Sequence, residues 1–129
     1  MTTPPNTTTR LYRQDPARAS VSTKSERYGR ATFSVKESSP SLAHVVVTGD
    51  IDAVNGRALA GYVERNAGGA KQLILDLRDV EFFGCLGFTA LCYIRAHCRY
   101  NDADWLIAGS RPVRRLLAIC DPEGRLPLA

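Results

Sequence analysis

The sequence lacks the features on which membrane insertion and most enzyme chemistry depend. No apolar run approaches the roughly 18 residues that a membrane-spanning helix needs, and the N-terminus has no apolar segment typical of a secretory signal. The chain contains no P-loop, no G-x-G-x-x-G run and no Ser-His-Asp order, and its two histidines, His44 and His97, lie far apart. We therefore expect a cytoplasmic protein that is neither an enzyme nor a membrane protein.

Cysteines are few, and their spacing argues against a metal site. The four cysteines stand at positions 85, 92, 98 and 120 without a C-x-x-C pair, so we expect no zinc site and no cofactor. Thiols stay mostly reduced in the cytosol, which predicts free cysteines. Cys98, late in a predicted helix, is the topologically nearer candidate to pair with Cys120, and intact mass under non-reducing conditions tests that pair.

The positive charge is concentrated at the N-terminus. The 129 residues carry a net charge of +4, and residues 1–30 hold six basic and two acidic side chains. This segment is rich in Thr, Ser, Pro and Arg and has almost no large aliphatic residues, so it cannot bury enough apolar surface to offset its ordering entropy. We predict a disordered basic tail over residues 1–30. Its basic residues are scattered, with only Tyr12 and Tyr28 able to stack on bases, so no direct nucleic-acid partner is expected.

The remainder, residues 31–129, reads as one α/β domain. Its elements alternate in the order β-β-α-β-α-β-α-β, which predicts a mixed, mostly parallel sheet of about five strands with a β-hairpin formed by the first two. Asp52 is a candidate N-cap for the first helix, and Ser110 for the last. The predicted strands and helices cover residues 31–36, 43–48, 53–67, 72–77, 85–100, 105–108, 111–117 and 125–128, the last confined to a sheet edge by Pro127.

The stretch from Leu73 to Phe88 is the most informative part of the chain. It predicts a buried strand, a short acidic turn and a glycine-marked start of a very apolar helix, which is the kind of junction where α/β folds present a site. The junction holds no general base, no pair of metal ligands and no phosphate-binding glycine run, which favours recognition over catalysis. The apolar helix is either deeply buried or partly covered by a partner. We expect a monomer or a weak homodimer.

Three segments together resemble a known family. Gly49–Asn55, Leu73–Phe83 and Ser110–Leu116 are similar, in order and spacing, to segments of the STAS domain, in particular of the bacterial anti-sigma factor antagonists. The resemblance covers residues 31–129. It implies a STAS fold and a protein that binds an anti-sigma factor, often one with a serine-kinase fold, and so frees a sigma factor.

The sequence departs from the family at the start of the second helix. Where the family usually has Asp-Ser-Ser-Gly-Leu, this chain has Gly84-Cys85-Leu86-Gly87-Phe88, so Leu86 occupies the phosphoacceptor position. Thr89 lies one turn later and is a poor substitute. Two interpretations stay open: Leu86 is an apolar contact in a constitutively competent surface, or Cys85 is a redox handle, because helix amide dipoles favour a thiolate near the N-terminus.

The resemblance and the pattern together define a predicted partner-binding face with Leu86 as its apolar anchor. An alternative hypothesis is a ligand-sensing STAS module for a nucleotide or small metabolite, which would need a concave pocket with convergent polar groups. The cysteines considered for redox chemistry are Cys85, Cys98 and Cys120. The predicted face comprises Asp50, Ile51, Asp52 and Asn55, then Gly84, Cys85 and Leu86, and finally Ser110 and Arg111.

Overall fold

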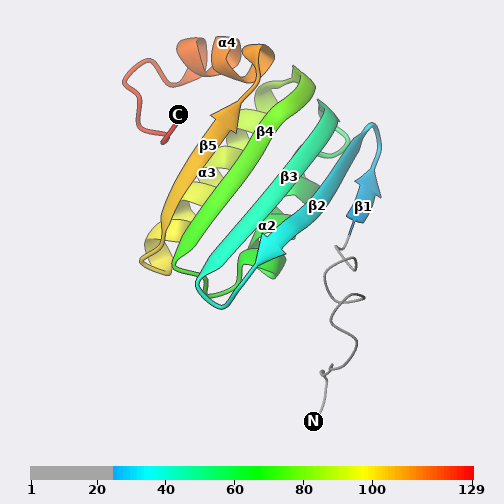
Figure 1. Cartoon of the computed structure of the whole chain (residues 1–129). Helices are drawn as coiled ribbons and strands as arrows, with labels where there is room; N and C mark the ends of the chain where they lie inside the picture. The colour runs from blue at the N-terminus through cyan, green and yellow to red at the C-terminus, as the bar shows by residue number, and fades with distance from the viewer. Residues whose placement is uncertain (1–24) are drawn as a thin grey trace.

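The computed structural model describes residues 25–129, which form a five-stranded sheet and three helices (Figure 1). The predicted α/β fold with a mixed sheet is confirmed. The predicted disorder of residues 1–24 lies outside the described residues. The elements are β1 (Ser25–Tyr28), β2 (Ala31–Ser38), β3 (Leu42–Ile51), α2 (Gly56–Ala67), β4 (Gln72–Phe83), α3 (Cys85–Tyr100), β5 (Asp104–Gly109) and α4 (Arg111–Cys120).

The strands lie side by side in chain order. β1 pairs with β2 and β2 with β3 in antiparallel fashion, whereas β3 pairs with β4 and β4 with β5 in parallel. The predicted β2–β3 hairpin is confirmed, and β1 adds a second hairpin, which makes the parallel part of the sheet smaller than expected. The predicted last strand is reduced to a single parallel bridge between Ile107 and Leu128.

The sheet begins six residues before the predicted start at residue 31. β1 was assigned to the tail because its sequence, Ser-Glu-Arg-Tyr, is mostly polar. Tyr28 supplies the missing apolar surface: its ring stacks on Phe33 with centroids 5.0 Å apart, and Phe33 in turn meets Tyr62 of α2 at 5.4 Å. One aromatic residue thus fixes a short strand that pattern alone does not reveal.

The hydrophobic core lies between the sheet and two helices. α2 and α3 cover one face of the sheet, while α4 lies near the carboxyl end of β5 (Figure 1). Alternate strand residues such as Val45, Val47 and Leu75 point into this core and are fully buried, each contributing roughly 1.5–3 kcal/mol of burial free energy. The opposite face carries no helix among residues 25–129 and leaves Leu106 43% exposed. No helix in this part of the chain is long and apolar enough to cross a bilayer.

β4 is longer than predicted. The acidic turn expected after Leu77 is instead a continuation of the strand to Phe83, paired with β3 as far as Ile51. The β3–β4 pairing shifts register between Val46 and Thr48 and again between Gly49 and Asp50. In a regular strand, residues three apart point to opposite faces, but these irregularities allow both Val80 and Phe83 to be buried. The acidic residues are therefore exposed strand positions, and the strand carries the chain directly to α3.

Candidate partner-docking edge

Two junctions meet at one end of the sheet and form a surface that we call the docking edge. It consists of the β3–α2 loop, residues 50–55, and the β4–α3 junction, residues 82–86. The main-chain N–H of Gly84 donates to the carbonyl of Ile51 at 2.9 Å, which joins the two junctions directly. The edge lies where parallel strands β3 and β4 end, as expected for a site in an α/β sheet.

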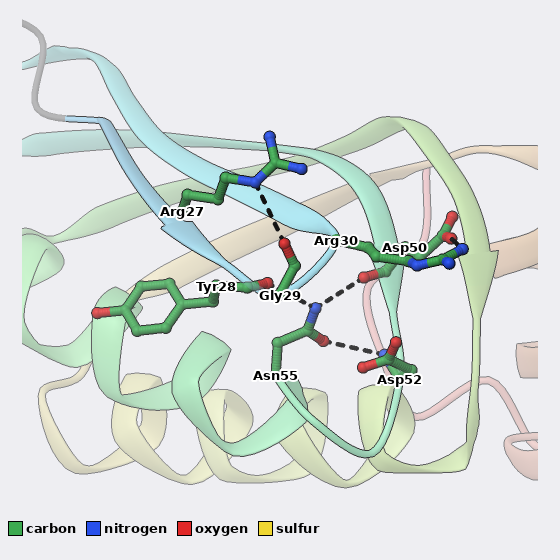
Figure 2. A network of polar contacts seen from close by, with 7 residues as sticks. All are labelled: Arg27, Tyr28, Gly29, Arg30, Asp50, Asp52 and Asn55. Atoms are coloured by element: carbon green, nitrogen blue, oxygen red, sulfur yellow. Dashed lines mark hydrogen bonds and ion pairs between the residues drawn. The ribbon is translucent and has the colours of Figure 1, made fainter.

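Asn55 holds the first junction in shape. Its side chain is fully buried, and its amide nitrogen donates to the carbonyls of Asp50 at 2.8 Å and Tyr28 at 3.0 Å. Its amide oxygen accepts the main-chain N–H of Asp52 at 2.9 Å. Figure 2 shows this side chain between the β1–β2 turn and the β3–α2 loop. One buried amide thus makes hydrogen bonds to three main-chain groups.

The β1–β2 turn packs tightly against the same loop. The main-chain N–H of Asp50 donates to the Arg30 carbonyl at 3.0 Å. Gly49 has a φ of 96°, and a Cβ there would lie 2.1 Å from that carbonyl oxygen, so only glycine fits. The Arg30 guanidinium also lies 3.9 Å from the Asp50 carboxylate, but the Arg30 side chain is 80% exposed and this ion pair adds little stability.

Glycines let the second junction approach α2 closely. A Cβ on Gly56 would lie 2.7 Å from the Cβ of Leu86, and a Cβ on Gly87 would lie 2.6 Å from the Phe83 ring. The first turns of α2 and α3 therefore touch through the Leu86 backbone and Cβ. Leu86 as a whole is 37% exposed, so part of this residue still reaches solvent.

Large apolar side chains are exposed at the docking edge. Leu86 is 37% exposed, Phe82 is 53% exposed and Val54 is 78% exposed. We refer to these three residues as the apolar cluster. The sequence predicts a helix over residues 53–67, which includes Val54, but α2 begins only at Gly56, so Val54 lies in the loop before it. Phe82 is exposed because adjacent strand residues point to opposite sides, and Phe83 occupies the core.

Several predicted contact residues have positioning roles instead. Ile51 and Asn55 are fully buried, so their side chains do not form an accessible surface. Asp52 does not cap α2 as predicted, because its carboxylate accepts the main-chain N–H of Val54 at 2.9 Å and the residue preceding the helix is Asn55. Asp50 and Asp52 are half-buried, while Cys85 is exposed beside Leu86. The sequence pattern located this loop but not which of its side chains point outward.

Ser110 and Arg111 are set back from the docking edge. The main-chain N–H of Ser110 donates to the Leu77 carbonyl at 3.2 Å, and β5 pairing with β4 stops at Leu77. Six residues of β4 follow before it ends at Phe83. The sequence predicts Ser110 and Arg111 as part of the same face, but β4 continues for six residues beyond the point at which β5 leaves it. The Ser110 hydroxyl is buried and makes no hydrogen bond within residues 25–129, so it does not cap α4 as predicted.

A buried carboxylate beneath the open sheet face is satisfied locally. Asp76 is 6% exposed, and its carboxylate accepts two hydrogen bonds from the Arg78 guanidinium, at 3.0 and 2.8 Å. These hydrogen bonds hold the pKa of Asp76 below its ordinary value of 3.8, against the opposing effect of burial. The Asp76 carboxylate thus has a structural role within β4, where Arg78 supplies its hydrogen bonds.

The four cysteines are free thiols in different environments. Cys85 and Cys92 are exposed, Cys120 is half-buried and Cys98 is 1% exposed in the core. Burial raises the pKa of the Cys98 thiol to about 11, so Cys98 forms the reactive thiolate less readily than an ordinary cysteine does.

Comparisons with known proteins agree with the fold. The chain is 32% identical over 89 residues to Osmosensory protein A of Mycobacterium tuberculosis, a match covering 66% of this chain and 56% of that protein, so the chain spans little more than half of that relative's length. It resembles the crystal structure of an anti-sigma factor antagonist from Mycobacterium paratuberculosis, with a TM-score of 0.64 and 26% identity over 76% of this chain and 84% of that one.

A second solved structure shows the same fold at lower identity. It is the unphosphorylated anti-sigma factor antagonist SpoIIAA, with a TM-score of 0.63 and 10% identity over 75% of this chain and 87% of that one. The STAS domain family model matches residues 34–124, which begin in β2 and end just after α4. The chain therefore belongs to the STAS domain family.

Proposed function

We propose that this chain is an anti-sigma factor antagonist, which binds an anti-sigma factor through the docking edge and thereby releases a sigma factor in the cytoplasm. The structural similarity to an anti-sigma factor antagonist supports this kind of function. The observation that carries the proposal is the exposure of the apolar cluster at the two junctions, because exposed apolar and aromatic side chains are frequent anchors of protein interfaces.

Leu86 gives this docking edge a character different from the phosphorylated members of the family. Leucine has no hydroxyl group, so a serine kinase cannot transfer phosphate to this position. Apolar burial also favours a partner that offers an apolar depression rather than a phosphate-binding cluster. We propose that binding is not switched off by phosphorylation at the family position, and that the partner is an anti-sigma factor with a serine-kinase fold.

A nucleotide-sensing or metabolite-sensing role has less support. A cavity of about 200 Å³ lies between α3 and the segment after α4, which is smaller than the roughly 300–1,000 Å³ usual for ligand sites. The docking edge itself is built from exposed apolar side chains and a buried amide that already has its hydrogen-bond partners. These features favour a protein partner.

The experiment titrates the full chain against purified anti-sigma factors of its own organism by calorimetry. Leu86→Asp places a charge among the apolar cluster, and we expect it to weaken binding by at least about 30-fold, the loss typical of an interface anchor. Leu106→Asp is the matched control, because Leu106 is 43% exposed but lies on the open sheet face. Equal affinity of the Leu86 variant and the wild type would contradict the proposal, as would failure of every anti-sigma factor to bind.

A further inference from the structure

A cavity away from the docking edge brings two cysteines together. It has a volume of about 200 Å³ and lies between α3 and the segment that follows α4. Phe88 and Leu126 form part of its apolar wall, and Arg95 and Asp121 contribute charge. Cys92 and Cys120 both line it, although 28 positions separate them in the sequence.

The chain holds both thiols in defined positions. Cys92 lies in the middle of α3, on its exposed side, where it is accessible to small reagents. Cys120 is the last residue of α4. The next residue, Asp121, fixes the segment that closes the cavity, because its carboxylate accepts the main-chain N–H groups of Arg125 and Leu126, each at 2.9 Å. Leu126 is 5% exposed and anchors that segment in the core.

The electrostatics of the cavity agree with this proximity. Burial raises the pKa of the Cys92 thiol, and the charges of Asp121 and of a Cys120 thiolate raise it further, while Arg95 lowers it. The charge of Cys120 thus acts on the Cys92 thiol, as expected for two groups that line one cavity. Cys98, by contrast, does not line the cavity and faces the core, so the sequence-based choice of Cys98 as the partner of Cys120 is replaced by Cys92.

We propose that Cys92 and Cys120 form a reversible disulfide across this cavity when the protein meets a peroxide. A thiolate of the pair attacks one oxygen of hydrogen peroxide, which gives a sulfenic acid and, after protonation of the leaving hydroxide, water. The second thiolate then attacks the sulfenic sulfur, the S–S bond forms and a second water leaves. Two thiols lose two electrons and two protons, and the peroxide is reduced to two molecules of water.

The bridge would join α3 to the end of α4. Closing a loop of this length restricts the unfolded chain, and we expect the midpoint of thermal unfolding to rise by on the order of 10 °C. Leu86 lies in the first turn of α3. The disulfide would therefore fix the position of α4 relative to the helix that carries part of the docking edge. The inference does not depend on the identity of any partner.

The test uses the full chain, treated with hydrogen peroxide and analysed by intact mass and peptide mapping without reductant. We expect the wild type to lose about 2 Da, the mass of two hydrogens, through a single 92–120 crosslink that dithiothreitol reverses. The Cys85→Ser and Cys98→Ser controls should lose the same mass, whereas Cys92→Ser and Cys120→Ser should not. No intramolecular bridge, or a bridge between any other pair, would overturn the proposal.

Discussion

Asn55 connects three segments through one buried side chain. The side-chain amide of Asn55 makes hydrogen bonds to the main chain of Tyr28, Asp50 and Asp52. These hydrogen bonds connect the end of β1 to the loop that precedes α2. The sequence predicted this residue as a contact for a partner, because a buried amide and a surface amide look the same in a pattern. Only the position of β1, which was assigned to the tail, reveals that Asn55 is enclosed.

Removal of the Asn55 amide should destabilise the protein and loosen the docking edge. Asn55→Ala removes hydrogen bonds to one main-chain N–H and two main-chain carbonyls in a buried site, and we expect the free energy of unfolding in urea to fall by about 2–4 kcal/mol. Asn66→Ala is the control, because the Asn66 amide makes one bond to the Tyr62 carbonyl within α2 and should cost less than about 1 kcal/mol. Equal losses in the two variants would show that the network adds no particular stability.

Leu86 is the residue at which sequence and structure agree most usefully. We propose that Leu86 stands where other members of the family carry a modifiable hydroxyl group, and the structure leaves 37% of that residue exposed. Full burial would have made it a core residue with no direct role in binding. Its exposure keeps the proposed anchor available to a partner.

Among the elements, α3 was located accurately and β4 was not. The bounds of α3 follow from local signals, the glycine at its start and Asn101-Asp102 at its end. The length of β4 depends on how far β3 continues beside it, which is a non-local pairing that residue patterns do not report. The same reason explains why the sequence groups Ser110 and Arg111 with the docking edge, whereas the pairing of β5 with β4 stops at Leu77.

Contact between the first turns of α2 and α3 sets the position of Leu86. In Gly56→Ala the added methyl group would meet the Leu86 Cβ at 2.7 Å and its carbonyl oxygen at 3.0 Å, so the helices must separate. We expect a loss of about 1–3 kcal/mol in the free energy of unfolding despite the better helix propensity of alanine.

Gly61 offers a matched control for that substitution within the same helix. A Cβ on Gly61 meets only the end of the Arg65 side chain, at 3.4 Å, so Gly61→Ala should be neutral or stabilising by up to about 1 kcal/mol. Thermal and urea unfolding of both variants provide the comparison. If Gly56→Ala is as stable as Gly61→Ala, the close approach of α2 and α3 does not constrain the docking edge.

For the whole molecule, the fold class was predictable and the functional surface only in part. The order of strands and helices follows from apolar periodicity, and three segments suffice to indicate the family. The exposure of Val54 and Phe82 depends on where α2 starts and where β4 ends, and the cavity shared by Cys92 and Cys120 depends on the segment after α4 folding back. These are tertiary consequences that no single stretch of sequence contains.

The most direct test of the central claim maps the contact surface in the complex. Amide hydrogen exchange of the full chain, measured alone and bound to its anti-sigma factor, reports which backbone segments gain protection. We expect protection over residues 50–55 and 82–90, with residues 104–108 of β5 and residues 111–120 of α4 unchanged. Protection confined to β5, α4 or the open face of the sheet, with the docking edge unaffected, would contradict it.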